Sequence, residues 1–185
     1  MPLLLLLILL VASLVTAEEQ RKNYGTPNPN APAELKTFGQ LIGKWSVETT
    51  FTDRNGSTQK STGTWTFYYI LEGMAIADDY DAKTTDGQRF YGTTYRLYNP
   101  GSKKWECKWI SATPLYWMEI EGPAATGKDI LLDGMIVPTD GNPILSKIRF
   151  TDITANSFTW KSDVSYDGGK TWKKDRGLIK ARRID

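Results

Sequence analysis

The 185-residue sequence contains no histidine and a single cysteine, Cys107. The absence of histidine excludes catalytic triads built on a histidine base, histidine-ligated zinc and histidine-ligated haem. A single cysteine cannot form an intrachain disulfide, so we expect Cys107 to be buried or paired between chains. The sequence therefore predicts no catalytic set, no metal site and no cofactor.

The sequence also lacks a block of basic residues and any long amphipathic helical pattern. Its 23 Lys and Arg and 21 Asp and Glu are interspersed, which gives a formal net charge of +2. Nucleic-acid binding requires a concentrated basic face, so no nucleic-acid partner is predicted. What the chain has is aromatic residues, including seven Trp and nine Tyr. Flat rings pack well on pleated strands, and the length fits one domain.

The amino-terminal end predicts export. Residues 3–15 form an apolar run, and Val15-Thr16-Ala17 resembles a small-residue cleavage site that makes Glu18 the first mature residue. The run is short for a transmembrane helix, so we expect a signal peptide over 1–17 and no stable membrane insertion after its removal. No Lys or Arg precedes the run, and an uncleaved anchor is the alternative. The predicted location is secreted or periplasmic.

The next segment changes from polar to helical character. Residues 18–33 are charged and then rich in Pro and Asn, which predicts a disordered leader. Leu35, Phe38 and Leu41 then recur at helical spacing after Pro32. We expect one or two helical turns to plug one end of the domain that spans residues 34–185.

Strands separated by turns fill the rest of the sequence. Trp105 and the residues after it alternate between apolar and charged, and Asn55-Gly56 is a strong hairpin turn. The pattern is typical of an all-β, antiparallel up-and-down barrel of about eight to ten strands, since closure removes exposed strand edges. The predicted strands are residues 44–52, 58–71, 74–82, 88–98, 104–112, 115–121, 129–137, 144–153, 157–166 and 171–183.

Gly43-Lys44-Trp45, after a helical turn and before an all-β chain, resembles the Gly-x-Trp signature of the calycins, the lipocalin-like barrels. The resemblance covers most of the chain from Phe38 on and is closest to uncharacterised bacterial lipocalin-like single-domain proteins. It implies that Trp45 packs across the barrel floor and is covered by a late basic residue, here Arg182 or Arg183. It also implies a barrel with an apolar interior, and no particular reaction.

Two neighbouring strands carry the candidate ligand residues. Trp105, Cys107 and Trp109 alternate on one strand, and Trp117 and Met118 lie on the next. One interpretation is an aromatic pocket for an apolar or planar ligand. The other is an ordinary packed barrel interior. The residues leave both open.

Tyr91 and Tyr95 are further candidates because they share one face of their strand, whereas Arg96 falls on the other. If the tyrosine face points inward, both hydroxyls can donate hydrogen bonds to a ligand carbonyl or carboxylate. If it does not, the tyrosines cap the rim.

An acidic cluster precedes this strand. In Asp78-Asp79-Tyr80-Asp81 only Asp79 and Asp81 share a face, and the spacing does not match a calcium loop. We interpret it as a solvated strand end.

A single Asp-box-like motif spans residues 165–172. Asp167 can accept backbone N–H groups of the turn, Gly169 can take positive φ, and Trp172 can pack over the loop. The motif occurs once, which excludes a propeller, and it predicts a hairpin turn.

The leading functional hypothesis is an exported carrier that binds a small hydrophobic or aromatic ligand inside a calycin-like barrel. The alternatives are an isomerase, cyclase or hydratase acting on a lipid or terpenoid, or a non-catalytic protein-interaction module. In the enzyme, acid–base chemistry would fall to Asp79, Glu119 or a tyrosine.

Overall fold

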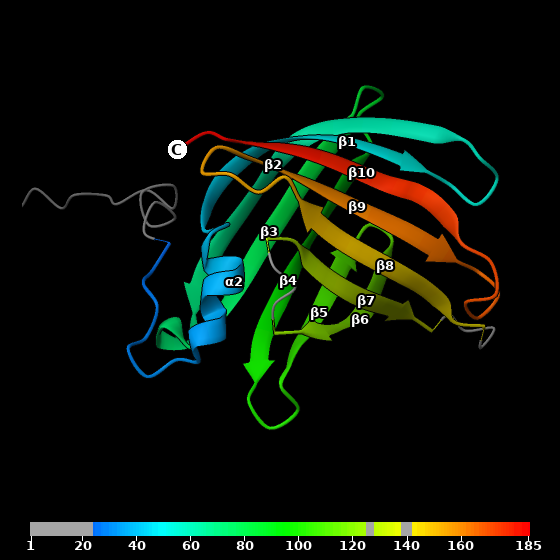
Figure 1. Ribbon diagram of the computed structural model, residues 1–185. Coiled ribbons are helices and arrows are strands. Elements are labelled where there is room, and N and C mark those ends of the chain that lie inside the picture. Colours follow the sequence, from blue (N-terminus) through cyan, green and yellow to red (C-terminus); the bar gives the residue numbers. More distant parts are fainter. Residues whose placement is uncertain (1–23, 125–127, 138–141) are drawn as a thin grey trace, which may run out of the picture.

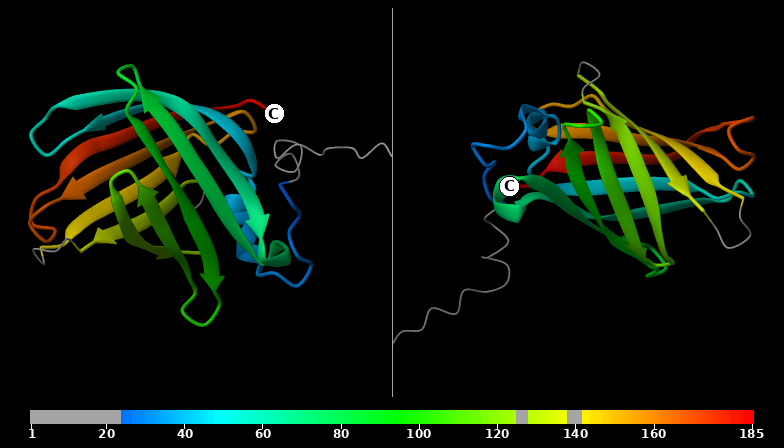
Figure 2. Two further views of the ribbon diagram at one scale, coloured as in Figure 1. Left: turned by 180° about the vertical axis from the view of Figure 1, so that it is seen from behind. Right: turned by 90° about the horizontal axis from the view of Figure 1, so that it is seen from below.

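The computed structural model describes residues 24–124, 128–137 and 142–185. Ten antiparallel strands form a closed barrel in which each strand pairs with the next and β10 returns to pair with β1 (Figures 1 and 2). This confirms the prediction of an all-β up-and-down barrel. The predicted signal peptide, residues 1–17, lies outside the described residues.

The strands are long, and hairpin turns connect most of them. Short helical turns stand at two places, η1 and α2 before the first strand and η2 between the second and third. The elements are η1 (Ala33–Leu35), α2 (Lys36–Gly39), β1 (Gly43–Thr52), β2 (Thr58–Ile70), η2 (Leu71–Gly73), β3 (Ala75–Thr84), β4 (Arg89–Asn99), β5 (Lys104–Ala112), β6 (Leu115–Pro123), β7 (Ile130–Ile136), β8 (Ile144–Thr151), β9 (Ser157–Ser165) and β10 (Lys173–Arg183).

The β1–β2 hairpin forms where Asn55-Gly56 predicted it. Gly56 has φ of 92°, a conformation that side chains with a Cβ rarely adopt. The Asp53 carboxylate accepts the backbone N–H groups of Asn55 and Ser57, each at 2.8 Å. The turn is therefore held by its own side chain, as is usual for Asx turns.

The Asp-box-like motif forms the β9–β10 hairpin, as predicted. Asp167 accepts the backbone N–H of Thr171 at 2.9 Å, and the Trp172 indole N–H donates to the carbonyl of Gly169 at 3.1 Å. Gly169 has φ of 90°. The motif is a turn on a barrel, and it places the start of β10 at one end of the molecule.

Residues 24–33 correct the prediction of a disordered leader. The backbone N–H of Tyr69 donates to the carbonyl of Tyr24 at 2.8 Å, and that of Asn28 donates to the carbonyl of Gly73 at 3.0 Å. Pairing with the barrel satisfies backbone groups of this segment, so it does not need to bury an apolar face of its own. Residues 18–23 of the predicted leader lie outside the described part of the chain.

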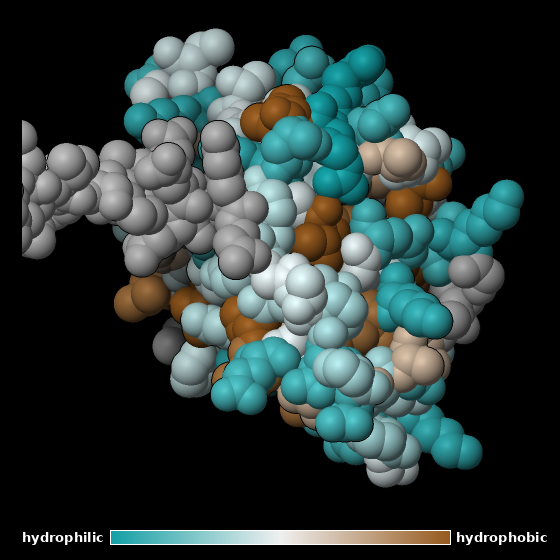
Figure 3. Space-filling view, turned by 90° about the vertical axis from the view of Figure 1, so that its left-hand side faces the viewer, coloured by the Kyte–Doolittle hydropathy of each residue, from teal (hydrophilic) through white to brown (hydrophobic). Residues whose placement is uncertain are grey.

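The predicted helical plug closes one end of the barrel, which we call the floor. Leu35, Phe38 and Leu41 are all buried, and α2 lies against the strand ends in Figure 1. The Phe38 and Trp105 rings meet edge to face, with centroids 4.8 Å apart at 84°. Figure 3 looks onto this side of the molecule, where hydrophobic residues show as separate patches among hydrophilic ones.

The Arg183 side chain covers the Trp45 ring at the floor of the barrel. Its Cζ lies 4.0 Å from the centroid of the Trp45 ring, and its Nη1 donates to the carbonyl of Ile42 at 2.7 Å. The Trp45 indole N–H donates to the carbonyl of Leu41 at 2.8 Å. Of the two predicted basic residues Arg183 therefore covers Trp45. Arg182, its neighbour on the strand, is exposed on the opposite face.

Candidate ligand site in the barrel lumen

The lumen changes character from the floor to the open end, which we call the mouth. Alternation places every second residue of each strand inside the barrel. Near the floor these residues are all buried, and most are large: Trp45, Phe67, Ile76, Tyr98, Trp105, Ile130, Phe150, Phe158 and Ala181. Toward the mouth, seven of them carry hydroxyl groups: Thr49, Ser61, Tyr80, Thr94, Ser111, Ser146 and Ser162. Trp109, Met118 and Trp160 also face inward in this half. The mouth half is therefore more polar than the floor half.

A buried ion pair separates the two halves. Asp78 is fully buried and pairs with Arg96, which is also buried. The Trp65 indole N–H donates to Asp78 Oδ1 at 2.5 Å, and Thr94 Oγ1 donates to the same oxygen at 3.3 Å. Such a pair stays buried because additional hydrogen bonds satisfy the carboxylate. The sequence interpretation of a solvated strand end is therefore wrong for Asp78 and correct for Asp81, which pairs with Arg89 on the outer face.

Two glycines let tryptophan rings lie along the wall of the mouth half. A Cβ on Gly92 would come within 2.6 Å of Trp109 Cη2, and one on Gly177 would come within 2.7 Å of Trp160 Cζ3. Each indole thus occupies the space that a side chain on the neighbouring strand would fill. Both tryptophans face inward yet remain only partly buried. The wall of the mouth half therefore carries partly exposed, flat aromatic surface.

Polar groups stand beside these rings. The hydroxyls of Thr49 and Tyr80 are 2.6 Å apart, and the Tyr80 ring meets Trp109 edge to face at 6.4 Å. Burial raises the pKa of Tyr80 and of Tyr116, and in both cases hydrogen bonds oppose the shift only in part. Both phenols therefore keep their protons at neutral pH and can donate hydrogen bonds.

The structure brings only some of the predicted ligand residues together. Trp109 and Met118 lie in the mouth half, facing the lumen from adjacent strands at paired positions. Trp105 forms part of the floor, fully buried beneath the plug. Cys107 lies between them in the layer of Arg96, and burial raises the pKa of its thiol to about 12. A thiol with this pKa is a poor nucleophile, and we assign Cys107 to packing.

Three predicted ligand residues lie outside the barrel, which corrects their assignment to a lumen pocket. Trp117 is 61% exposed, and Lys108 Nζ lies 4.4 Å from its ring centroid. Tyr91 and Tyr95 are exposed on the outer face of β4. The reason is strand alternation: Met118 and Arg96 point inward, so their neighbours must point outward. The sequence analysis had separated Tyr91 and Tyr95 from Arg96 correctly, but alternation does not say which face is inside. It had also grouped the neighbours Trp117 and Met118, which lie on opposite faces.

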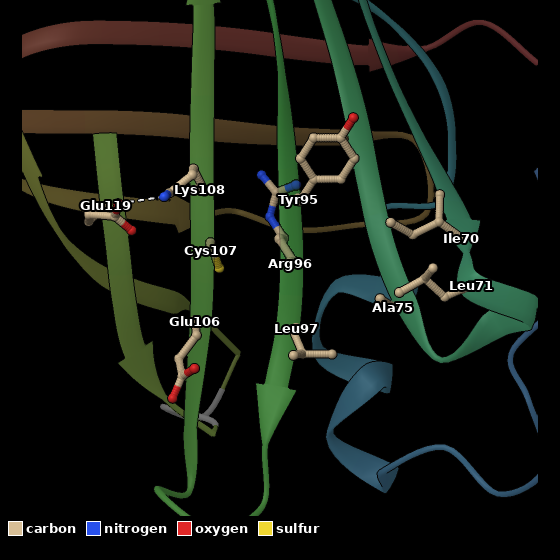
Figure 4. Close-up of a pocket in the computed structure, with 10 residues that line it drawn as sticks. All are labelled: Ile70, Leu71, Ala75, Tyr95, Arg96, Leu97, Glu106, Cys107, Lys108 and Glu119. Atoms are coloured by element: carbon tan, nitrogen blue, oxygen red, sulfur yellow. Dashed lines mark ion pairs between the residues drawn. The ribbon is translucent and has the colours of Figure 1, made fainter. Parts of the chain in front are cut away.

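The outer face carries a shallow groove, shown in Figure 4, with a volume of about 290 Å³. It runs over β4, β5 and β6 and reaches the Ile70-Leu71 corner, and Tyr95 and Leu97 lie along it. Lys108 and Glu119, which are paired on β5 and β6, also line it and form an ion pair of 2.8 Å. Tyr95, Leu97, Lys108 and Glu119 lie on the outer face, whereas Arg96 and Cys107, which also line the groove, belong to the buried layer between the two halves. Neither Trp109 nor Trp160 lines it.

The sequence reasoning missed Trp160, Tyr80, Gly92 and Gly177 as lumen residues. Some of these residues could have been found from the sequence. Strand alternation gives every inward position of a strand once one of its residues is known to point inward. The role of the glycines was not accessible, because it depends on which residue lies opposite on the neighbouring strand.

In the described part of the chain, no three His, Cys, Asp or Glu residues are grouped to hold a metal ion. No helix among the same residues is long and apolar enough to cross a bilayer.

Comparison with curated proteins gave no match to the sequence. Among solved structures, Rv2717c from M. tuberculosis superposes with a TM-score of 0.62 at 12% identity, over 84% of this chain and 100% of that chain. The S-type phycobiliprotein lyase CPES from Guillardia theta gives a TM-score of 0.49 at 12% identity, over 82% of this chain and 92% of that chain. A redesigned beta barrel, mFAP1, bound to DFHBI, gives 0.41 at 14% identity, over 80% and 98%.

At such low identity the likeness to Rv2717c shows a shared fold, which is consistent with the predicted calycin-like barrel. The sequence itself matches one family model, over residues 31–174, which include most of the barrel. The chain therefore belongs to the family described as Protein of unknown function (DUF1579).

Proposed function

We propose that this protein is an exported carrier that holds a small hydrophobic or aromatic molecule in the mouth half of its lumen. One observation carries the proposal: Gly92 and Gly177 allow the indoles of Trp109 and Trp160 to lie along the wall, partly exposed and facing inward. Ligand sites are typically concave and apolar, with a few placed polar groups. Here the Tyr80 hydroxyl is one such group.

The lumen favours binding over acid–base catalysis. Asp79 and Glu119, the carboxylates named for the enzyme alternative, lie on the outer face, where Asp79 accepts a hydrogen bond from Thr93 Oγ1 at 2.7 Å. Tyr80 and Tyr116 keep their protons, because burial raises the pKa of each. A phenol held in this form donates a hydrogen bond to a ligand and does not act as a general base at neutral pH.

Export is the second part of the proposal. It rests on the apolar run of residues 3–15 and the small residues Val15-Thr16-Ala17. Amino-terminal sequencing of the protein purified from its own host tests it. Glu18 as the first residue would support export with cleavage, whereas an intact Met1 or Pro2 in the soluble fraction would contradict it.

The carrier proposal is tested first by comparing native and denaturing mass spectra of the full protein from its own host. A discrete extra mass that is lost on denaturation is the expected result. In parallel, the protein is titrated with 1-pyrenebutanol, a neutral and planar fluorescent probe. We expect Trp109→Ala to weaken binding of the probe by about tenfold or more, which corresponds to about 1.4 kcal/mol.

The matched control is Trp117→Ala, which removes the same side chain from the outer face one strand away. It is expected to bind the probe like the wild type. Circular dichroism and urea unfolding establish that both variants are folded. Equal binding by the wild type and Trp109→Ala would show that the probe does not contact this wall, and would contradict the lumen site.

A further inference from the structure

Four charged side chains are buried in the described part of the chain, and one of them has no ionic partner. Asp78 pairs with Arg96, and Asp163 pairs with Arg149 at 2.7 Å. Arg176 is 5% exposed, its Nε contacts no acceptor, and no carboxylate of the described residues lies within ion-pair distance. Burying an unpaired charge costs several kcal/mol, so Arg176 is an exception to the rule that the other three follow.

Arg176 lies at the mouth, beside the aromatic wall. It directly precedes Gly177, the glycine that accommodates Trp160. Its Nη2 donates to the hydroxyl of Tyr166 at 3.2 Å, and its Cζ lies 5.7 Å from the centroid of the Tyr166 ring. The ring and the hydroxyl of Tyr166 therefore hold the guanidinium in one place, and the hydroxyl accepts its hydrogen bond.

Two more cations join it from neighbouring hairpins. The Cζ of Arg54, from the β1–β2 hairpin, lies 5.0 Å from the centroid of the same Tyr166 ring. Lys173 Nζ donates to the carbonyl of Arg54 at 3.1 Å and so ties the two hairpins together. We call Arg54, Lys173 and Arg176 the mouth cation cluster. Figure 1 shows both hairpins at the end of the barrel away from α2.

The two carboxylates of these hairpins, Asp53 and Asp167, are bonded within their own turns. Asp53 accepts two backbone N–H groups of its own turn, both at 2.8 Å. Asp167 is bonded to Thr171 in the other turn, and these hydrogen bonds lower its pKa to about 2. Among the described residues, neither carboxylate is in ion-pair contact with Arg54, Lys173 or Arg176. Both carboxylates stay ionised, but the three cations of the cluster outnumber them, so a local excess of positive charge remains.

We propose that the mouth cation cluster binds an anionic oxygen group of the ligand, and that Arg176 makes the central contact. The inference rests on the proposed carrier function and narrows the ligand class. The ligand is an apolar or planar molecule that ends in a carboxylate, sulfate or phosphate. Its body lies against Trp109 and Trp160, and its anionic end lies at the mouth. A guanidinium suits this role because its planar fork of donors matches the oxygens of such groups.

The test compares two probes that share the same apolar body. We titrate the full protein with 1-pyrenebutyrate and with 1-pyrenebutanol at low ionic strength. The wild type is expected to bind the carboxylate at least tenfold more tightly, with a preference that shrinks as salt is added. Arg176→Met keeps an unbranched apolar side chain and removes the charge. This variant is expected to lose the preference for 1-pyrenebutyrate and to bind 1-pyrenebutanol with unchanged affinity.

Arg182→Met is the matched control, because it removes an exposed arginine from the same strand near the floor. It is expected to keep the preference. Arg54→Met, on an exposed hairpin, keeps the test decisive if Arg176→Met does not fold, and is expected to reduce the preference about threefold. Equal binding of both probes by the wild type would overturn the anion site and leave the carrier standing. Binding of neither probe would overturn both.

Discussion

Arg96 and Arg176 are two arginines of the same barrel, buried to nearly the same degree, 4% and 5% exposed. Arg96 faces the fully buried carboxylate of Asp78 and lies over the rings of Phe38 and Phe67, 4.8 Å and 5.3 Å from their centroids. Arg176 donates a hydrogen bond to Tyr166, and no carboxylate of the described residues forms an ion pair with it. The difference teaches that burial alone does not assign a role to a charge. A neutralised arginine belongs to the fold, whereas an unneutralised one at an opening is available to a ligand.

The largest expected effect comes from removing the partner of Arg96. Asp78→Ala leaves that guanidinium buried without a counter-charge, and we expect it to destabilise the protein by about 3–5 kcal/mol. Burial already lowers the pKa of Arg96 to about 10, so it remains charged at neutral pH. Urea unfolding followed by tryptophan fluorescence measures the loss.

The double variant Asp78→Ala with Arg96→Met sharpens this prediction. It replaces the ion pair by apolar groups, and we expect it to recover most of the lost stability. A loss of less than about 1 kcal/mol in the single variant would show that Arg96 does not depend on Asp78, and the contrast with Arg176 would fail.

Asp163 gives an intermediate effect, because it is a buried carboxylate whose partners come from the outer wall. Arg149 binds it at 2.7 Å and 3.0 Å, and Lys174 binds it at 3.1 Å. The hydrogen bonds from Arg149, the largest cause, hold its pKa far below its usual range. A carboxylate with a lowered pKa stabilises the fold above its unfolded pKa of about 3.9, and this contribution is lost as the pH falls below about 4.

We therefore expect Asp163→Asn to cost about 2–3 kcal/mol at pH 7 and progressively less at pH 4, 3 and 2. Urea unfolding at each pH measures the difference from the wild type. Asp133→Asn, on the exposed face of β7, is the control and should follow the wild type at every pH. A cost for Asp163→Asn that stays constant down to pH 2 would contradict the role of its charge.

The smallest expected effect on stability is that of Arg176→Met. Removing a buried charge that has no ionic partner relieves desolvation, which offsets the lost hydrogen bond to Tyr166. We expect the free energy of unfolding to change by less than about 1 kcal/mol in either direction. A loss of 3 kcal/mol or more in urea unfolding would make Arg176 a structural arginine like Arg96, and the comparison would break.

Much of the fold could be predicted from local patterns. The hairpin at Asn55-Gly56 and the Asp-box turn around Asp167 are present as predicted. The side chains that stabilise a turn lie within a few residues of it in the sequence, so such turns can be predicted locally. The pairing of Trp45 with Arg183 followed from the resemblance, and the structure shows it directly.

The candidate site was less accessible, because it depends on register and on irregular backbone. Asp78 and Arg96 are 18 residues apart, and only the β3–β4 register brings them together. Alternation separated the face of Tyr91 and Tyr95 from that of Arg96 without saying which was inner. Arg176 lies where the register of β9 and β10 shifts between Lys173 and Gly177, and no simple periodicity predicts such a bulge.

The pairing of Trp45 with Arg183 has a consequence for how the chain folds. The seams between consecutive strands join residues that are near in sequence, but the seam between β1 and β10 joins residues more than a hundred positions apart. The entropy lost in closing a loop grows with its length, so this seam is the most demanding to form and is expected to close last during refolding. Arg183 contacts the carbonyls of Gln40, Ile42 and Ala155 as well as Trp45. The Arg183 side chain therefore adds contacts to both sides of the β1–β10 pairing that closes the barrel.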